Sequence, residues 1–185
     1  MKIKYGVKNL KYSKLTYSGN SETYGSYVDI PGAKSISLTP AGETVTEYAD
    51  DIVWYTEEEN TGYTGDVEVE EVPESFLKDI LGMIEDTAGA LFESNTDVRA
   101  EFALAGEFTY AGDSSLTGKR FCLFRCVAAR PNTNGTTKQQ NKTVDTDRIG
   151  ITVLPRKSDG AVKATAVSTD TAYSTWFSAV VSKQS

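Results

Sequence analysis

The sequence contains no histidine and only two cysteines, Cys122 and Cys126. Without histidine a chain cannot form the Ser-His-Asp or Cys-His pairs that activate many protein nucleophiles, and it lacks the commonest ligand of transition metals. Two cysteines and no histidine are also too few for a structural zinc site within one chain. The sequence therefore predicts no metal and no cofactor.

The two cysteines are also too few for a disulfide scaffold. If residues 121–129 form one strand, both side chains lie on the same face, about 13 Å apart at ~3.3 Å per residue. That separation is too long for a disulfide bond. We therefore predict that Cys122 and Cys126 are buried free thiols in a core.

The chain has no apolar run long enough to cross a bilayer. Its N-terminus, MKIKYGVKNLKYSKL, is basic but has neither the apolar core nor the small-residue cleavage site of a signal peptide. These features predict a soluble protein made in a cytoplasm, with no membrane partner. The length of 185 residues is enough for one domain, residues 1–185, with a real core.

Basic residues are missing from a long stretch of the chain, because no Lys or Arg lies between Lys34 and Lys78. The net charge is +4 over residues 1–34, −12 over 35–74, −6 over 75–118 and +7 over 119–185, which adds to −7. A net acidic protein is a poor general DNA binder, since phosphate contacts need Lys and Arg. Segregated charges suit association between copies of the same chain.

Two segments begin like ligand-binding loops but lack essential residues. In GDSSLTGKR, the spacing from Gly112 to Gly118 is one residue too long for a phosphate-binding loop, and Arg120 replaces the magnesium-binding Ser or Thr. In DTDRIG, Ile149 occupies a calcium-ligand position and Arg156 replaces the bidentate Glu. Neither segment predicts an ion site.

The remaining pattern predicts a mainly β protein. Eight segments alternate in polarity or are rich in Val, Ile, Thr and Tyr: residues 8–17, 33–39, 43–49, 62–72, 98–110, 119–129, 147–155 and 161–167. Gly, Pro and Asn-rich turns separate them. Long polar stretches at 40–62 and 131–146 are candidate functional loops or extended hairpins.

Two helices are predicted. The first spans residues 73–82, with Pro73 at the first helical position and Gly82 at the C-terminal cap. The second lies within residues 168–183, in a C-terminal hairpin and helix region that spans 156–185. Each should pack an apolar stripe on a sheet. The packing residues are Phe76, Leu77, Ile80 and Leu81 in the first helix, and Trp176 and Phe177 in the second.

The stretch GYTGDVEVEEVPESFLKDILG places Asp66, Glu68 and Glu70 in alternation with valines on one predicted strand. Carboxylates two residues apart lie ~7 Å apart, within the range of the acid and base of an inverting glycosidase. Such a pair needs a cleft and one desolvated carboxyl group. A solvated sheet face or a functional acidic surface are the other interpretations, and no basic residue nearby in sequence offsets the charge.

The same stretch resembles a signature of the major tail proteins, or tail tube proteins, of long-tailed phages of Gram-positive hosts. There a Gly-Tyr-x-Gly-Asp-acid strand leads through Pro into a short helix that ends Ile-Leu-Gly. Other segments are similar in the same order: YGVKNLKYSKLT, VDIPGAKSISLTPAGETVTEYADD, KRFCLFRCVAARP, ITVLPRKSDGAVKA and AYSTWF. The similarity covers nearly the whole chain, except residues 87–118, which vary in loop content.

The resemblance implies a β-sandwich or open barrel with one packed helix, a C-terminal helix and an extended loop. It implies a structural virion protein rather than an enzyme, assembled in the host cytoplasm into rings, commonly hexamers, that stack into the tail tube. Its partners would be copies of itself and the tape measure, tail terminator and distal tail proteins. DNA would pass through the lumen without specific binding.

Within this interpretation, Asp66, Glu68 and Glu70 would line the lumen and repel phosphate. Residues 40–62 would form a loop or hairpin that contacts the next ring. Its contact residues would be Glu43, Asp50, Asp51, Trp54, Tyr55, Glu57 and Glu58. The alternatives are a decoration or carbohydrate-binding β-sandwich with an exposed aromatic platform, and a hydrolase that uses paired acids.

Overall fold

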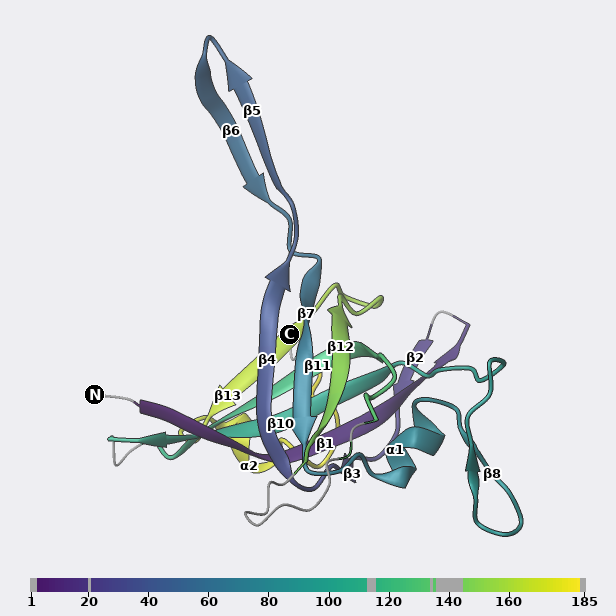
Figure 1. Ribbon diagram of the computed structural model, residues 1–185. Coiled ribbons are helices and arrows are strands. Elements are labelled where there is room, and N and C mark those ends of the chain that lie inside the picture. The colour runs from purple at the N-terminus through teal and green to yellow at the C-terminus, as the bar shows by residue number, and fades with distance from the viewer. Residues whose placement is uncertain (1–2, 20, 113–115, 134, 136–144, 184–185) are drawn as a thin grey trace.

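A computed structural model describes residues 3–19, 21–112, 116–133, 135 and 145–183. The chain is mainly β, with a large antiparallel sheet and few helices (Figure 1). Its main sheet has the strand order β2-β1-β10-β11-β12-β7-β4. These strands are β1 (Ile3–Ser18), β2 (Ser21–Tyr24), β4 (Ala33–Ala41), β7 (Gly62–Val69), β10 (Phe102–Ala111), β11 (Gly118–Ala128) and β12 (Asp147–Leu154).

Two further strands join this sheet at its sides. Strand β3 (Val28–Asp29) pairs with β1, and β13 (Lys163–Val167) pairs with β11. Residues 119–123 of β11 pair with β13, whereas residues 125–128 pair with β12. Two strands therefore share one edge of β11 and the sheet divides there. The branch that ends in β4 curls back until β4 approaches β1, which gives an open barrel with a core inside.

The first helix, α1 (Glu74–Asp79), packs at one end of this barrel. Phe76, Ile80 and Leu81 are buried and Leu77 is half-buried, so the apolar stripe lies against the core. The ring of Phe76 makes an edge-to-face contact with Tyr12, with the centroids 5.2 Å apart. Such aromatic pairs stabilise a core beyond their burial alone.

The structure corrects three details of the predicted helices. Pro73 precedes α1 as its N-cap residue, in an extended conformation, and the helix begins at Glu74. The C-cap residue of α1 is Ile80 rather than Gly82. The second helix is much shorter than predicted, because α2 covers only Thr171–Ser174 and turns follow. Ser and Thr favour turns over helix by bonding to nearby backbone groups. Trp176 is nevertheless buried, and its indole N–H donates to the Phe121 carbonyl at 3.3 Å.

A second apolar cluster lies on the outer face of β10 and β11, beneath this C-terminal segment. Small side chains on the two strands leave room for Trp176 and half-buried Phe177, so the segment covers this face. Alternation along β10 sends Phe102 and Leu104 into the barrel core, and Ala103 and Ala105 outward to the second cluster.

The cysteines are free and buried, as predicted, but they do not share a face. Cys122 belongs to the outer cluster and Cys126 to the barrel core. The reason is a β-bulge, since Phe102 pairs with Cys126 whereas Leu104 pairs with Leu123. The extra residue in β11 reverses the alternation. Burial raises the pKa of the Cys122 thiol to about 11 and that of Cys126 well above its usual value.

Two short hairpins project from the barrel (Figure 1). Strands β8 (Ile84–Glu85) and β9 (Leu91–Phe92) form the smaller one after α1. Strands β5 (Thr44–Ala49) and β6 (Ile52–Glu58) form the longer one between β4 and β7. The longer hairpin falls within residues 40–62, for which a loop or extended hairpin was predicted. Most of the other polar stretch, 131–146, lies outside the described residues.

Candidate assembly surfaces

The β5–β6 hairpin extends beyond the ends of β4 and β7, away from the barrel (Figure 1). Its strands are joined by a two-residue turn, Asp50 and Asp51, with φ angles of 52° and 61°. Positive φ at both central residues is the backbone of a type I′ turn, whose twist matches that of a two-stranded ribbon. Asp tolerates this conformation better than most residues. The local sequence therefore closes the hairpin.

Large apolar side chains on this hairpin are left uncovered by the subunit. Tyr48 is 71% exposed and Trp54 is 70% exposed. Tyr48 pairs with Val53 and Glu47 pairs with Tyr55, so Trp54 is the extra residue of a bulge. The other exposed apolar residues of the hairpin are Val45, Ile52, Val53 and Tyr55. An isolated two-stranded hairpin is only marginally stable in water, which makes this surface a candidate contact site.

The acidic contact residues follow the same two strands. Glu43 precedes β5, and its carbonyl accepts the Glu59 N–H at 3.1 Å, which extends the ladder to the base of the hairpin. Glu57 accepts a hydrogen bond of 2.6 Å from the Tyr55 hydroxyl, which raises the pKa of that tyrosine. Glu58 is exposed and pairs with Thr44.

The acidic row of β7 lies on a polar sheet face. Val67 and Val69 are buried in the core, whereas Asp66 and Glu68 lie on the opposite face and are partly exposed. On β4, the pairing register places Ser35 beside Glu68 and Ser37 beside Asp66. On β12, it places Arg148 beside Glu68 and Gly150 beside Asp66. Glu70 lies just beyond β7 and is exposed.

This row has a basic partner that the sequence did not indicate. The Arg148 guanidinium lies 3.3 Å from a Glu68 oxygen and 3.8 Å from an Asp66 oxygen. A hydrogen bond from the Thr146 hydroxyl, together with the charge of Arg148, lowers the pKa of Glu68. No Lys or Arg lies nearby in sequence, but antiparallel pairing of β12 with β7 brings Arg148 beside Glu68, so the charge of the row is partly offset.

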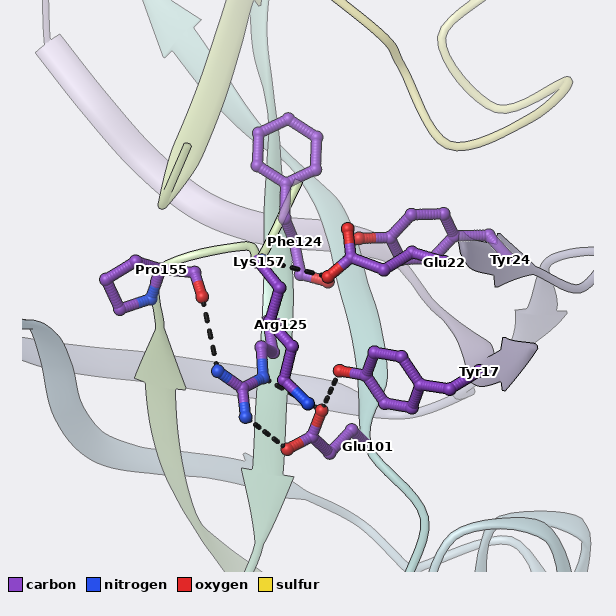
Figure 2. Close-up of polar contacts among 8 residues, drawn as sticks. All are labelled: Tyr17, Glu22, Tyr24, Glu101, Phe124, Arg125, Pro155 and Lys157. Carbon is purple, nitrogen blue, oxygen red and sulfur yellow. Dashed lines mark hydrogen bonds and ion pairs between the residues drawn. The ribbon is translucent and has the colours of Figure 1, made fainter. Parts of the chain in front are cut away.

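A polar cluster joins β1 and β11 to Glu101, which directly precedes β10, and to Pro155, which directly follows β12 (Figure 2). Arg125 donates two hydrogen bonds of 2.8 Å to the two oxygens of Glu101, and a third of 3.4 Å to the Pro155 carbonyl. The Tyr17 hydroxyl donates to the same carboxylate. These hydrogen bonds, above all those from Arg125, lower the pKa of Glu101. The cluster therefore holds an ionised carboxylate and joins distant strands.

A second carboxylate, Glu107 of β10, is buried with 5% of its side chain exposed. Burial opposes its ionisation, but hydrogen bonds from Arg120 and Lys8 outweigh burial and lower its pKa. The two ion-pair distances are 3.0 Å to Arg120 and 3.2 Å to Lys8. The Arg120 guanidinium also lies over the rings of Tyr173 and Phe177, at 3.9 and 4.6 Å from their centroids. This arrangement fastens the C-terminal segment to the sheet.

These carboxyl groups bear on the catalytic alternative. Among the described residues, every carboxyl group with a shifted pKa is shifted downward: Glu68, Glu101, Glu107 and Asp159. A glycosidase general acid needs the opposite shift. The described part of the chain also contains no group of three His, Cys, Asp or Glu side chains placed to hold a metal ion.

The comparisons with known proteins found no match, either among protein-family models or among curated proteins. Within the described ranges, no helix is both long enough and apolar enough to span a membrane.

Proposed function

We propose that this chain is a structural subunit of a tube built from stacked rings, of the phage tail tube type. The observation that carries the proposal is the β5–β6 hairpin, which leaves Trp54 and Tyr48 exposed far from the barrel core. Burial of such surface in a neighbouring subunit would gain about 25 cal/mol per Å² of apolar area. A monomer would obtain none of that stabilisation.

The polar face of β4, β7 and β12 supports the second half of the proposal, passage of DNA. Asp66 and Glu68 lie there beside the small residues Ser35, Ser37 and Gly150 and beside Arg148, and Glu70 follows just beyond the end of β7. Repeated around a ring, such a face would present carboxylates to a channel, although Arg148 partly offsets the charge of Asp66 and Glu68. Close to the wall, polyanionic DNA would be repelled, although salt screens the effect beyond ~8 Å.

The test compares the full chain with a variant that lacks the hairpin. Ala41 pairs with Gly62 at the base of the hairpin, so residues 42–61 can be replaced by a turn of about four residues. Shortening a twenty-residue connection in this way should favour folding by roughly 1.4 kcal/mol through lower loop-closure entropy. The variant should therefore melt no lower than the wild type.

Negative-stain electron microscopy and sedimentation at rising concentration provide the measurement. The full chain should form rings or tubes, and the hairpin-deleted variant should stay folded but form no tubes. In reconstructions, Asp66, Glu68 and Glu70 should line the channel. A full chain that stays monomeric at high concentration would contradict the proposal and favour a binding module. Normal tubes from the deleted variant would contradict the role of the hairpin.

A further inference from the structure

The end of the barrel opposite α1 is open and forms a pocket of about 430 Å³. Along β10, Phe102 packs near α1 whereas Phe108 lines the pocket, and along β7, Val69 is buried whereas Tyr63 lines the pocket. Ile36, Leu38, Phe108 and Tyr63 are only partly buried there. The subunit therefore leaves one end of its own apolar core uncovered.

Lysines are the charged residues that line this pocket. Lys4, Lys119 and Lys163 contribute to its wall, and none of its described lining residues is acidic. The ammonium of Lys4 lies 4.5 Å from the centroid of the Phe108 ring, and that of Lys163 lies 4.6 Å from the centroid of Tyr63. Among the residues that the structure places, none of the three lysines forms an ion pair. The pocket suits an occupant that is both aromatic and acidic.

The chain itself contains one segment with that chemistry. Residues 43–59 carry seven acidic side chains, no basic one, and three aromatic residues, Tyr48, Trp54 and Tyr55. All three aromatic side chains are exposed on the β5–β6 hairpin. Carboxylates can pair with the lysines at the rim, while an indole or phenol ring replaces water against Tyr63 and Phe108.

The hairpin of one subunit cannot fill its own pocket. Tyr63 pairs with Pro40, one residue from the point where the hairpin leaves the sheet. The six residues of β5 carry the tip about 20 Å beyond that point at ~3.4 Å per residue. Figure 1 shows the hairpin directed away from the barrel. A contact between tip and pocket must therefore join two molecules.

We infer that the open barrel end lined by Lys4, Lys119 and Lys163 receives the acidic, aromatic hairpin tip of a second copy of this chain. The contact joins two different surfaces, so it is heterologous and can repeat from copy to copy. This inference rests on the proposed assembly function and names the surface that receives the hairpin. It needs no ligand other than the chain itself.

Charge reversal tests the contact. The variant K4E/K163E changes two exposed lysines at the pocket, and K14E/K183E makes the same change in net charge at exposed lysines outside it. We expect K4E/K163E to raise the concentration for half-maximal assembly about tenfold or more, and K14E/K183E to change it little. Circular dichroism and thermal melting should show that both variants remain folded.

The complementary variant is E47K/E57K, which reverses two carboxylates of the hairpin. It should also assemble poorly, whereas the chain that carries K4E, K163E, E47K and E57K together should recover assembly because the charges again oppose each other. Carbodiimide treatment of assembled wild type, mixed from two isotope-labelled pools, should join Lys4, Lys119 or Lys163 to residues 43–59 between molecules.

The outcomes separate this contact from the proposed function. If the wild type forms tubes and K4E/K163E assembles equally well, this result contradicts the inferred contact between hairpin and pocket but not the proposed tube function. If that variant assembles normally but loses retention of a double-stranded oligonucleotide, the pocket is a phosphate site and the contact is again wrong. A wild type that stays monomeric contradicts both proposals.

Discussion

Replacement of Arg120 by Met should lower the free energy of unfolding more than the loss of an exposed ion pair would. Glu107 is buried, and Arg120 is its nearer partner at 3.0 Å, whereas Lys8 lies at 3.2 Å and is half exposed to solvent. The substitution keeps the length and the apolar stem of the side chain. It removes one of the two charges that hold Glu107 ionised, and the same guanidinium that lies over Tyr173 and Phe177.

The expected cost follows from these contacts. Removing one partner of a buried ion pair costs about 3–5 kcal/mol, because the other charge is left without compensation. Lys8 remains near Glu107, so we expect a loss of about 3 kcal/mol at pH 7 from the pair itself. Replacing both residues, as in Glu107→Leu with Arg120→Met, should cost less than the sum of the single changes, since no charge is then left unpaired.

Urea unfolding followed by Trp fluorescence and circular dichroism measures both quantities. With an m value of ~2 kcal/mol per M, a loss of 3 kcal/mol lowers the midpoint by about 1.5 M. The double-mutant cycle should give a coupling of at least ~1 kcal/mol. The urea midpoint of Arg120→Met could instead fall by less than about 0.5 M, or the losses in unfolding free energy of the two single variants could simply add. Either result would refute the idea that this ion pair stabilises the packing of the C-terminal segment.

Two further predictions concern the core and acid stability. Ile80→Ala should cost about 2–5 kcal/mol, measured by the same unfolding assay, because Ile80 is the C-cap residue of α1 and is fully buried; a loss below ~1 kcal/mol would show that the helix packs weakly. Glu101 has a lowered pKa when folded, so its stabilisation is present above its usual value near 4.5 and is lost as the pH falls through the folded value. The melting temperature of the wild type should therefore fall more between pH 6 and pH 3 than that of Glu101→Gln, and equal falls would contradict this origin of the acid sensitivity.

The periodicity of apolar residues within single segments was enough to predict strand β7 and helix α1 and the face that each buries. Alternation over residues 62–72 correctly predicted a strand, although β7 ends at Val69, before Glu70. The structure places Val67 and Val69 inside with Asp66 and Glu68 outside. Side chains of a strand point alternately to its two faces, so one polar row and one apolar row suffice to orient it. The stripe of α1 has the same local origin, with a period of 3.6 residues.

Tertiary structure alone decided which distant groups meet. Arg148 reaches Glu68 across 80 positions of sequence, because β12 and β7 pair in one particular antiparallel register. A bulge in β11 sends Cys126 to the face opposite Cys122. The pocket that contains Lys4, Lys119 and Lys163 exists because the sheet curls into an open barrel. Helix α1 covers one end of this barrel and leaves the opposite end open. Register, bulges and curvature arise from long-range pairing and packing, which the period of a single segment does not encode.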